Sequence, residues 1–298
     1  MEPNPLLKKL GFARDDRVVI IHTDDIGMCQ ASVTAFAELN EAGIISSGAV
    51  MVPCPWFPEA AHYAAAHPQA DLGVHATLTS EWERYRWGPV STRDPATGLL
   101  DKEGFFPHRS EEIQASGSPA AVQVELAGQV QRALQFGMKP THVDTHMGAV
   151  AHPKFMMAYV QLAWSFHMPP MIFRMDEAGY RATTGMDAAS AAAAVELMKS
   201  QEYSGLPLLD HITGMNLDTP ENRLERTKQA LSSLEPGVTH FIIHPSADTP
   251  ELRAITPDWA CRVADYQDFL NSELRDHLRQ AGIHVIGYRA IQDVMPKI

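Results

Sequence analysis

The chain has 298 residues, a formal net charge of −12 at pH 7 and a hydrophobic content of 45%. This negative charge argues against nucleic-acid binding, because phosphates would be repelled and the sequence has no concentrated basic stripe to attract them. No apolar run reaches the ~18 residues of a membrane span, so we expect no insertion into a membrane. The N-terminus lacks the apolar segment of a signal peptide, which predicts a cytoplasmic protein.

Predicted strands and helices alternate along the first part of the chain. The apolar run 18–21 predicts the first strand, and the spacing of apolar residues predicts a helix over 30–42. Further strands are expected over 47–52 and 71–77, with a helix over 56–67 between them.

A long insertion at about 80–119 interrupts this alternation. It is rich in proline and glycine and carries the aromatic residues Trp82, Tyr85 and Trp87. Irregular segments of this length are uncommon in compact domains unless they serve as lids or binding loops. The aromatic side chains suit stacking on sugar rings, although a surface insertion that packs its own aromatic residues explains the composition equally well.

The alternation resumes after the insertion and continues to the end of the chain. The predicted elements are helix 120–136, strand 142–148, helix 153–167, strand 171–175, helix 187–200, strand 208–213, helix 220–234, strand 239–244, helix 260–281 and strand 284–288. Strands separated by helices imply right-handed parallel crossovers. Seven or eight such units predict an α/β fold, a (β/α) barrel formed by one domain over 1–298.

Three of the apolar runs end in an aspartate or a histidine. Asp24 and Asp25 follow the first run, His75 ends the third strand, and Asp144 and His146 lie on one face of the strand over 142–148, because alternate strand residues share a face. The C-terminal ends of barrel strands meet at one face, where such barrels build active sites. One carboxylate and two imidazoles leave an open position for water, as a catalytic metal site requires.

The same ligand set also serves non-haem iron oxygenases. Each of these residues also has a simpler interpretation that involves no metal. An aspartate at a strand-to-helix junction often caps the next helix, and a lone histidine is usually a hydrogen-bonded core or surface residue. Three polar strand ends in one alternating chain nevertheless favour a site, and they point to a metal-dependent hydrolase.

Two further residues end predicted strands at the same rim. His244 follows an apolar strand and suits a general acid near neutral pH. Arg174 ends the strand over 171–175, where it could orient a catalytic carboxylate, bind substrate or simply be exposed. We interpret the remaining histidines near strands and helix starts as structural: His22, His142, His152, His211 and His240.

Five ordered motifs make the sequence similar to the YdjC-like carbohydrate deacetylases. They occupy residues 23–27, 43–47, 73–79, 139–146 and 243–245, and the resemblance extends from about 17 to 288. It implies a polysaccharide-deacetylase-like (β/α) barrel that removes acetyl groups from N-acetylated sugars with one divalent metal ion.

The resemblance also implies roles for individual residues. Carried over by position, Asp25, His75 and His146 would be the metal ligands, Asp24 the general base and His244 the general acid. Family members are often described with magnesium, whereas two imidazoles favour zinc or another transition metal. We therefore keep zinc and magnesium open.

Two departures from the family pattern leave the substrate contacts and the metal preference open. His22 and Thr23 replace the usual Asn-Ala, and 147–149 (Met-Gly-Ala) replaces further histidines. The leading hypothesis is hydrolytic N-deacetylation of a small acetylated sugar or oligosaccharide, and the sugar stays open. The alternatives are hydrolysis of another amide, oxygen-dependent iron chemistry, or sugar binding without catalysis; a homo-oligomer is also open. The expected substrate contacts are Trp82, Tyr85, Trp87 and Asp144.

Overall fold

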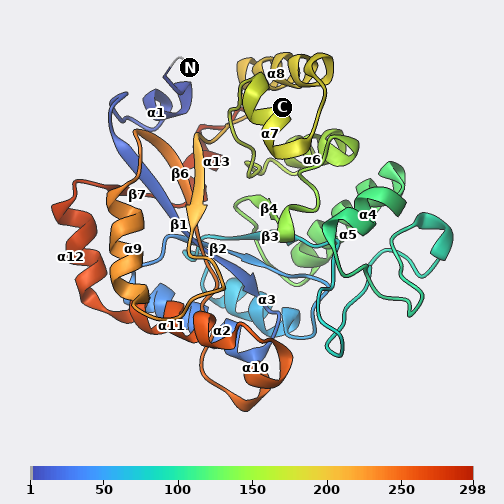
Figure 1. Ribbon diagram of the computed structural model, residues 1–298, viewed down its shortest axis with the longest axis horizontal. Helices are drawn as coiled ribbons and strands as arrows, with labels where there is room; N and C mark the ends of the chain where they lie inside the picture. The colour runs from blue at the N-terminus through green and yellow to red at the C-terminus, as the bar shows by residue number, and fades with distance from the viewer. Residues whose placement is uncertain (1–2, 298) are drawn as a thin grey trace.

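A curled sheet of seven parallel strands forms the centre of the molecule, and helices surround it (Figure 1). The computed structural model describes residues 3–297. The strand order is β4-β3-β2-β1-β6-β5, and β7 pairs with β1. The strands are β1 (Arg17–Ile26), β2 (Ser47–Val50), β3 (Leu72–Ala76), β4 (Val143–Thr145), β5 (His211–Gly214), β6 (Gly237–Ile243) and β7 (His284–Val285).

The segment 169–174 links the two edge strands of this sheet. Val143 of β4 forms a bridge with Pro170, and Phe173 forms one with Leu209, just before β5. The predicted strand over 171–175 therefore appears only as isolated bridges. Its ladder is interrupted because Pro169 and Pro170 have no N–H to donate. The predicted fold class, a barrel of parallel strands with intervening helices, is confirmed.

Helices cover the strands and follow most of the predicted ranges. They are α1 (Pro5–Lys9), α2 (Gln30–Ala42), α3 (Phe57–Ala66), α4 (Ser110–Ser116), α5 (Pro119–Gln135), α6 (Pro153–Ser165), α7 (Glu177–Thr184), α8 (Ala188–Tyr203), α9 (Arg223–Ser232), α10 (Pro250–Ile255), α11 (Trp259–Leu270), α12 (Ser272–Gln280) and α13 (Tyr288–Val294). The expected helix over 260–281 is instead α11 and α12, because the Asn271 side chain accepts the N–H of Glu273 and starts a new helix. No helix within 3–297 is long and apolar enough to span a membrane.

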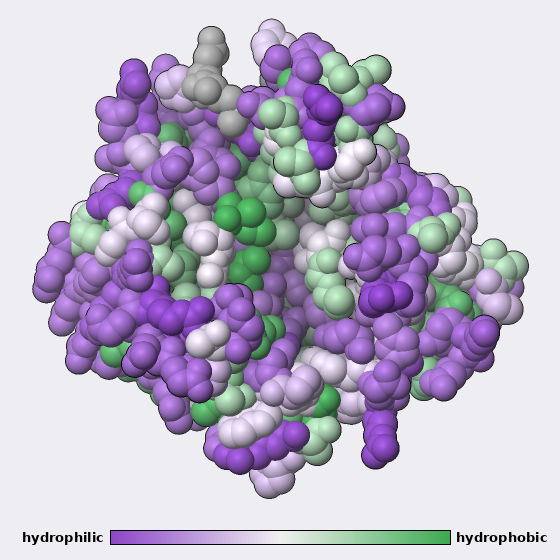
Figure 2. Space-filling view, viewed as in Figure 1, coloured by the Kyte–Doolittle hydropathy of each residue, from purple (hydrophilic) through white to green (hydrophobic). Residues whose placement is uncertain are grey.

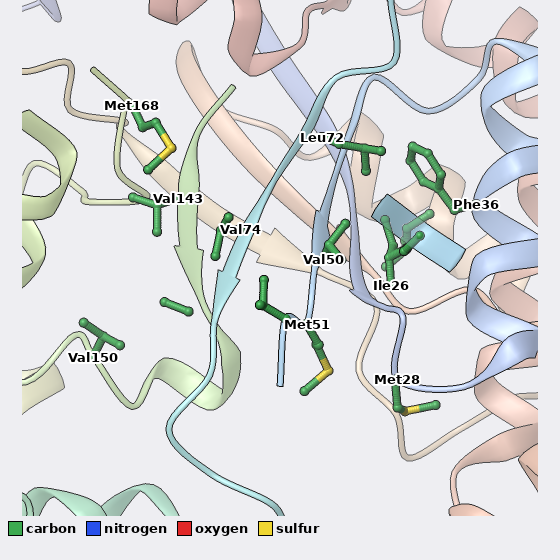
Figure 3. Packing of buried hydrophobic residues seen from close by; sticks show 14 of the residues in the cluster. Ile26, Met28, Phe36, Val50, Met51, Leu72, Val74, Val143, Val150 and Met168 are labelled. Atoms are coloured by element: carbon green, nitrogen blue, oxygen red, sulfur yellow. The ribbon is translucent and has the colours of Figure 1, made fainter. Parts of the chain in front are cut away.

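Apolar side chains pack between the strands and the helices. Figure 3 shows Phe36 of α2 beside Ile26 of β1, and Val50, Val74 and Val143 on successive strands. All five are buried. Burial of apolar area on this scale is the main term that holds such a fold together. This apolar core lies between the strands and the helices, so polar side chains can occupy the ends of the strands.

The insertion after β3 is ordered by one arginine. Arg86 donates to Asp101 at 2.6 Å and to the carbonyl of Phe106 at 2.7 Å, and it lies 2.9 Å from His108 Nε2. The segment contains a 3₁₀ turn at Pro95–Thr97 and the short helix α4, and it is otherwise irregular. These bonds hold the start and the end of the irregular segment together next to β3.

Candidate active site

The end of β1 turns two adjacent carboxylates into one cavity. Asp25 has φ +62°, and the pairing of β1 with β2 shifts register between Thr23 and Ile26. A positive φ is uncommon outside glycine, and such residues cluster at functional sites. Asp24 and Asp25 would face opposite sides of a regular strand, whereas both line the cavity here. The positive φ of Asp25 therefore directs the second carboxylate to the same cavity as the first.

Asp25, His75 and His146 converge from β1, β3 and the turn after β4. Asp25 Oδ1 lies 3.4 Å from His75 Nε2 and 3.1 Å from His146 Nδ1. Ligand atoms of a tetrahedral ion with bonds of about 2.1 Å are about 3.4 Å apart. Asp25 Oδ1 and His75 Nε2 are buried without a hydrogen-bond partner among residues 3–297, an arrangement that normally needs a ligand. The three side chains therefore fit a divalent ion.

Opposite charges govern the titration of this group. Burial acts to raise the pKa of Asp25, but attraction to Arg262 and His146 outweighs it and holds that pKa well below its usual range. Burial acts to lower the pKa of His146, yet the charges of Glu81 and Asp25 raise it to about 9. A field that stabilises an imidazolium also attracts a metal cation.

Carboxylates orient both imidazoles from behind. Asp144 Oδ1 lies 2.7 Å from His75 Nδ1, and Glu81 Oε2 lies 3.1 Å from His146 Nε2. Metal-binding histidines usually have such a partner, which fixes the tautomer. Asp144 is fully buried, and the register of β3 and β4 pairs it directly with His75. It does not line the cavity, in contrast to the substrate contact expected from the sequence.

Asp24 lies beside the triad and faces His244. Its Oδ1 is 2.8 Å from His22 Nδ1, and its Oδ2 is 3.8 Å from Nε2 of both His75 and His244. Burial acts to raise the pKa of Asp24, but attraction to His75 and His22 more than offsets this and lowers it. His244 is held at the end of β6 by its backbone N–H, which donates to Asp265 at 3.0 Å.

These groups share a cavity of about 390 Å³ with a charged floor and an apolar wall. Figure 2 shows a face that is hollowed near its centre, with hydrophobic residues gathered along the hollow. Met147 and Ile212 are each 48% exposed, an unusual state for large apolar side chains. The apolar residues of the wall are Trp82, Met147, Met171, Ile212, Leu217 and Ile242.

The aromatic residues of the insertion contribute unequally. Trp82 lines the cavity, and its ring lies 5.8 Å from the Arg262 guanidinium. Tyr85 donates its hydroxyl to the carbonyl of Met28 at 2.6 Å. Trp87 is buried and donates its indole N–H to the carbonyl of Thr79 at 2.7 Å. Only Trp82 of the three expected aromatic contacts is placed to meet a ligand.

An arginine of α11, Arg262, contacts a site carboxylate, which is one of the three possibilities that the sequence left open for Arg174. Its guanidinium binds Asp25 Oδ2 at 2.8 Å and Asp258 at 2.6 Å. An Asp–Arg pair four residues apart is ordinarily an exposed helical ion pair, so its spacing carries no signal for a buried role. Arg174 instead lies at a second cavity, of about 640 Å³, where it pairs with Glu202 at 2.9 Å.

The histidines interpreted as structural fall into two groups. His152 accepts the backbone N–H of Lys154 at the start of α6, and His211 contacts the carbonyl of Pro236. His22, His142 and His240 are fully buried and lie together, because the His22 ring contacts the other two and its Nδ1 contacts Asp24. The sequence alone could not distinguish these two groups.

The fold and this site define a class of protein, the α/β barrels that gather an Asp-His-His set at the carboxyl ends of their strands. Within that class, residues 18–280 match the family model described as YdjC-like protein. The chain belongs to the YdjC-like family. The resemblance expected from the motifs is thereby confirmed.

Individual relatives agree with this membership. A carbohydrate deacetylase of Thermus thermophilus is 32% identical over 97% of this chain and 99% of its own length. One from Thermoanaerobacter pseudethanolicus is 22% identical over 93% of this chain and 100% of its own. The crystal structure of a candidate cellobiose-phosphate cleavage protein from Enterococcus faecalis superimposes with a TM-score of 0.73 at 20% identity, covering 93% of this chain and 99% of that one. This structural likeness supports the fold.

Proposed function

We propose that this chain is a metal-dependent carbohydrate deacetylase that hydrolyses the N-acetyl group of a small acetylated sugar or oligosaccharide. The observation that carries the proposal is the convergence of Asp25, His75 and His146 beside Asp24 and His244 in one cavity. The carbohydrate deacetylases that match nearly the whole chain support the choice of substrate class.

Asp25, His75 and His146 would hold the metal. A divalent ion bound there supplies Lewis acidity toward the amide carbonyl and toward water. One carboxylate and two imidazoles suit zinc or another transition metal, and magnesium is the second candidate. Arg262 holds Asp25 through its other oxygen, so Oδ1 keeps its direction toward the two imidazoles.

Asp24 and His244 divide the proton transfers. Asp24 takes a proton from water as the water oxygen bonds to the acetyl carbon. His244, whose Nε2 lies 3.8 Å from Asp24 Oδ2, donates a proton to the sugar nitrogen as the carbon–nitrogen bond breaks. The products are acetate and the free amino sugar, so atoms and charge balance.

The apolar wall would receive the acetyl methyl group and the less polar face of the sugar. Trp82 presents its ring beside the charged floor, and aromatic faces are suited to such contacts. Met147 and Ile212 lie on this wall, and about half of each residue's surface is left uncovered by residues 3–297.

The direct test is acetate release from a panel of N-acetylated sugars by the protein loaded with zinc or with magnesium, alongside metal analysis. We expect acetate release from at least one sugar. We also expect metal analysis to find one bound metal ion per chain. A metal-loaded protein that releases no acetate from any sugar would overturn the proposed activity.

A further inference from the structure

A continuous chain of hydrogen bonds runs from Asp24 through the inside of the barrel to the opposite ends of the strands. Asp24 Oδ1 contacts His22 Nδ1 at 2.8 Å, and His22 Nε2 contacts His142 Nε2 at 2.9 Å. His142 Nδ1 contacts the Thr141 hydroxyl at 2.9 Å, and that hydroxyl donates to Asp71 Oδ1 at 2.5 Å. Asp71 directly precedes β3, whereas His75 lies near the other end of this strand.

At Asp71, the far end of this chain of hydrogen bonds, the direction of hydrogen-bond donation is defined. Asp71 accepts the backbone N–H of Arg289 at 2.7 Å and the hydroxyl of Ser47 at 3.3 Å, besides the Thr141 hydroxyl. Burial raises the pKa of Asp71, and the bonds from Thr141 and Arg289 act against that rise. A carboxylate surrounded by donors is an acceptor, so the single hydroxyl proton of Thr141 points to Asp71.

This direction sets which ring nitrogens of the two histidines donate hydrogen bonds. With its proton given to Asp71, Thr141 can only accept from His142 Nδ1–H. Burial and the neighbouring imidazoles hold the pKa of His142 well below its usual value, so the ring is neutral and its Nε2 is an acceptor. His22 must then donate from Nε2, and it also donates from Nδ1, because the ionised Asp24 carboxylate can only accept.

Packing locks the same arrangement. The Tyr288 ring stacks on His142 with centroids 3.9 Å apart and an angle of 11° between planes. On the other side, a Cβ on Gly73 would lie only 2.5 Å from His142 Cε1. The absence of a side chain at Gly73 is what leaves room for the imidazole in the barrel.

We propose that His22, His142, Thr141 and Asp71 form a positioning chain, which holds Asp24 by Oδ1 and leaves Oδ2 to face the cavity. This inference rests on the proposed function, in which Asp24 is the general base. It assigns a role in the reaction to Asp71 and Thr141, which do not line the cavity. Their effect on the base is exerted entirely through His142 and His22.

The test uses an isosteric change at the link and two matched controls. Thr141→Val removes the hydroxyl, Thr141→Ser keeps it, and Thr239→Val removes a buried threonine hydroxyl that has no partner among residues 3–297. Because a misoriented base lowers the rate of the chemical step, we expect Thr141→Val to reduce kcat roughly tenfold. KM and metal content should stay within about twofold of the parent protein in Thr141→Val. In both controls kcat should also stay within about twofold, which is well below the tenfold effect.

A spectroscopic measurement separates this inference from the proposed activity. Ring ¹⁵N signals of labelled His22 and His142 report which nitrogens of each imidazole carry a proton, with or without substrate. We expect Thr141→Val to change these signals and Thr141→Ser to retain them. Unchanged signals, an unchanged kcat in Thr141→Val, or an equal loss of kcat in Thr239→Val would overturn the positioning chain. Lack of acetate release by the parent protein would refute the proposed activity, while the ¹⁵N result would still decide the chain.

Discussion

Two large cavities of the protein differ in how their charged groups are arranged. The larger one, of about 640 Å³, lies between α7, α8 and the segment that closes the barrel. Arg174 there pairs with Glu202 and with Asp210, so its opposite charges face one another. Such pairs satisfy themselves and leave little for a ligand to bind.

The smaller cavity, of about 390 Å³, also contains ion pairs, but these leave some buried polar atoms of the site without a partner. Asp25 Oδ1 and His75 Nε2 are buried without a hydrogen-bond partner among residues 3–297. Unpaired buried polar atoms are costly, and a fold retains them where a ligand completes them. The convergence of incomplete polar groups, rather than volume, therefore distinguishes a candidate catalytic cavity.

The largest expected effect comes from removing a metal ligand. His75→Ala and His146→Ala should each reduce kcat/KM by about 10⁴-fold or more, because the Lewis acid is lost with its ligand. Metal content by atomic emission should fall in parallel. Wild-type metal stoichiometry in both variants would show that the ligand set is wrong.

The general base should be separable from the metal. Asp24→Asn keeps the size of the side chain and should lower kcat by about 10³-fold, within the range known for general bases. Metal content should be unchanged, because Asp24 is not among the three converging ligands. A variant that lost its metal would instead make Asp24 a ligand.

Arg262 should matter through Asp25. Arg262→Met should lower kcat roughly 30-fold, as loss of a group that orients a ligand does. It should also reduce the free energy of unfolding by about 3 kcal/mol, because Asp25 and Asp258 would remain buried without their cation. Arg253→Met is the matched control, since its pair with Asp248 is exposed. Steady-state kinetics and urea denaturation measure the two effects. Equal losses of kcat and of the free energy of unfolding in both variants would contradict a special role for Arg262.

The elements that are predictable from the sequence are those fixed by local periodicity. The helix expected over 30–42 is α2 (Gln30–Ala42), and the strand ends of β1, β3 and β6 bring Asp24, His75 and His244 together. Alternating strands and helices already require this meeting, because parallel strands end on the same side. The general location of the site therefore follows from the chain alone.

The missing parts depend on tertiary contacts. Arg262 lies on a helix, and its partner Asp25 is 237 residues away in the chain. Glu81 lies in the insertion, 65 residues from its partner His146. No local pattern in the sequence indicates either contact. The sequence favours a substrate contact for Asp144 because its alternation with His146 is visible, whereas its pairing with His75 depends on strand register. Register and helix rotation follow from packing in three dimensions, to which a periodic pattern is insensitive.

Two tryptophans of the insertion should separate binding from stability. Trp82→Ala should raise KM about fivefold, in line with the loss of one aromatic contact of about 1 kcal/mol, and should leave the melting temperature near that of the parent. Trp87→Ala should lower the free energy of unfolding by about 3 kcal/mol or more, because it empties a buried site. Steady-state kinetics and thermal melting distinguish the two. A larger KM effect from Trp87→Ala than from Trp82→Ala would contradict a direct substrate contact by Trp82 alone, since the centroids of the two rings lie 5.4 Å apart.

The smallest expected effect lies in the larger cavity. Arg174→Met should leave kcat/KM within about twofold of the parent protein, because its partners Glu202 and Asp210 are not among the residues that line the smaller cavity. Its melting temperature should fall, since two carboxylates lose a shared cation. Val195→Phe, which narrows the same cavity without removing a charge, should likewise leave the kinetics unchanged. A tenfold loss of kcat/KM in both folded variants would mean that the larger cavity takes part in the reaction, and the contrast between the two cavities would fail.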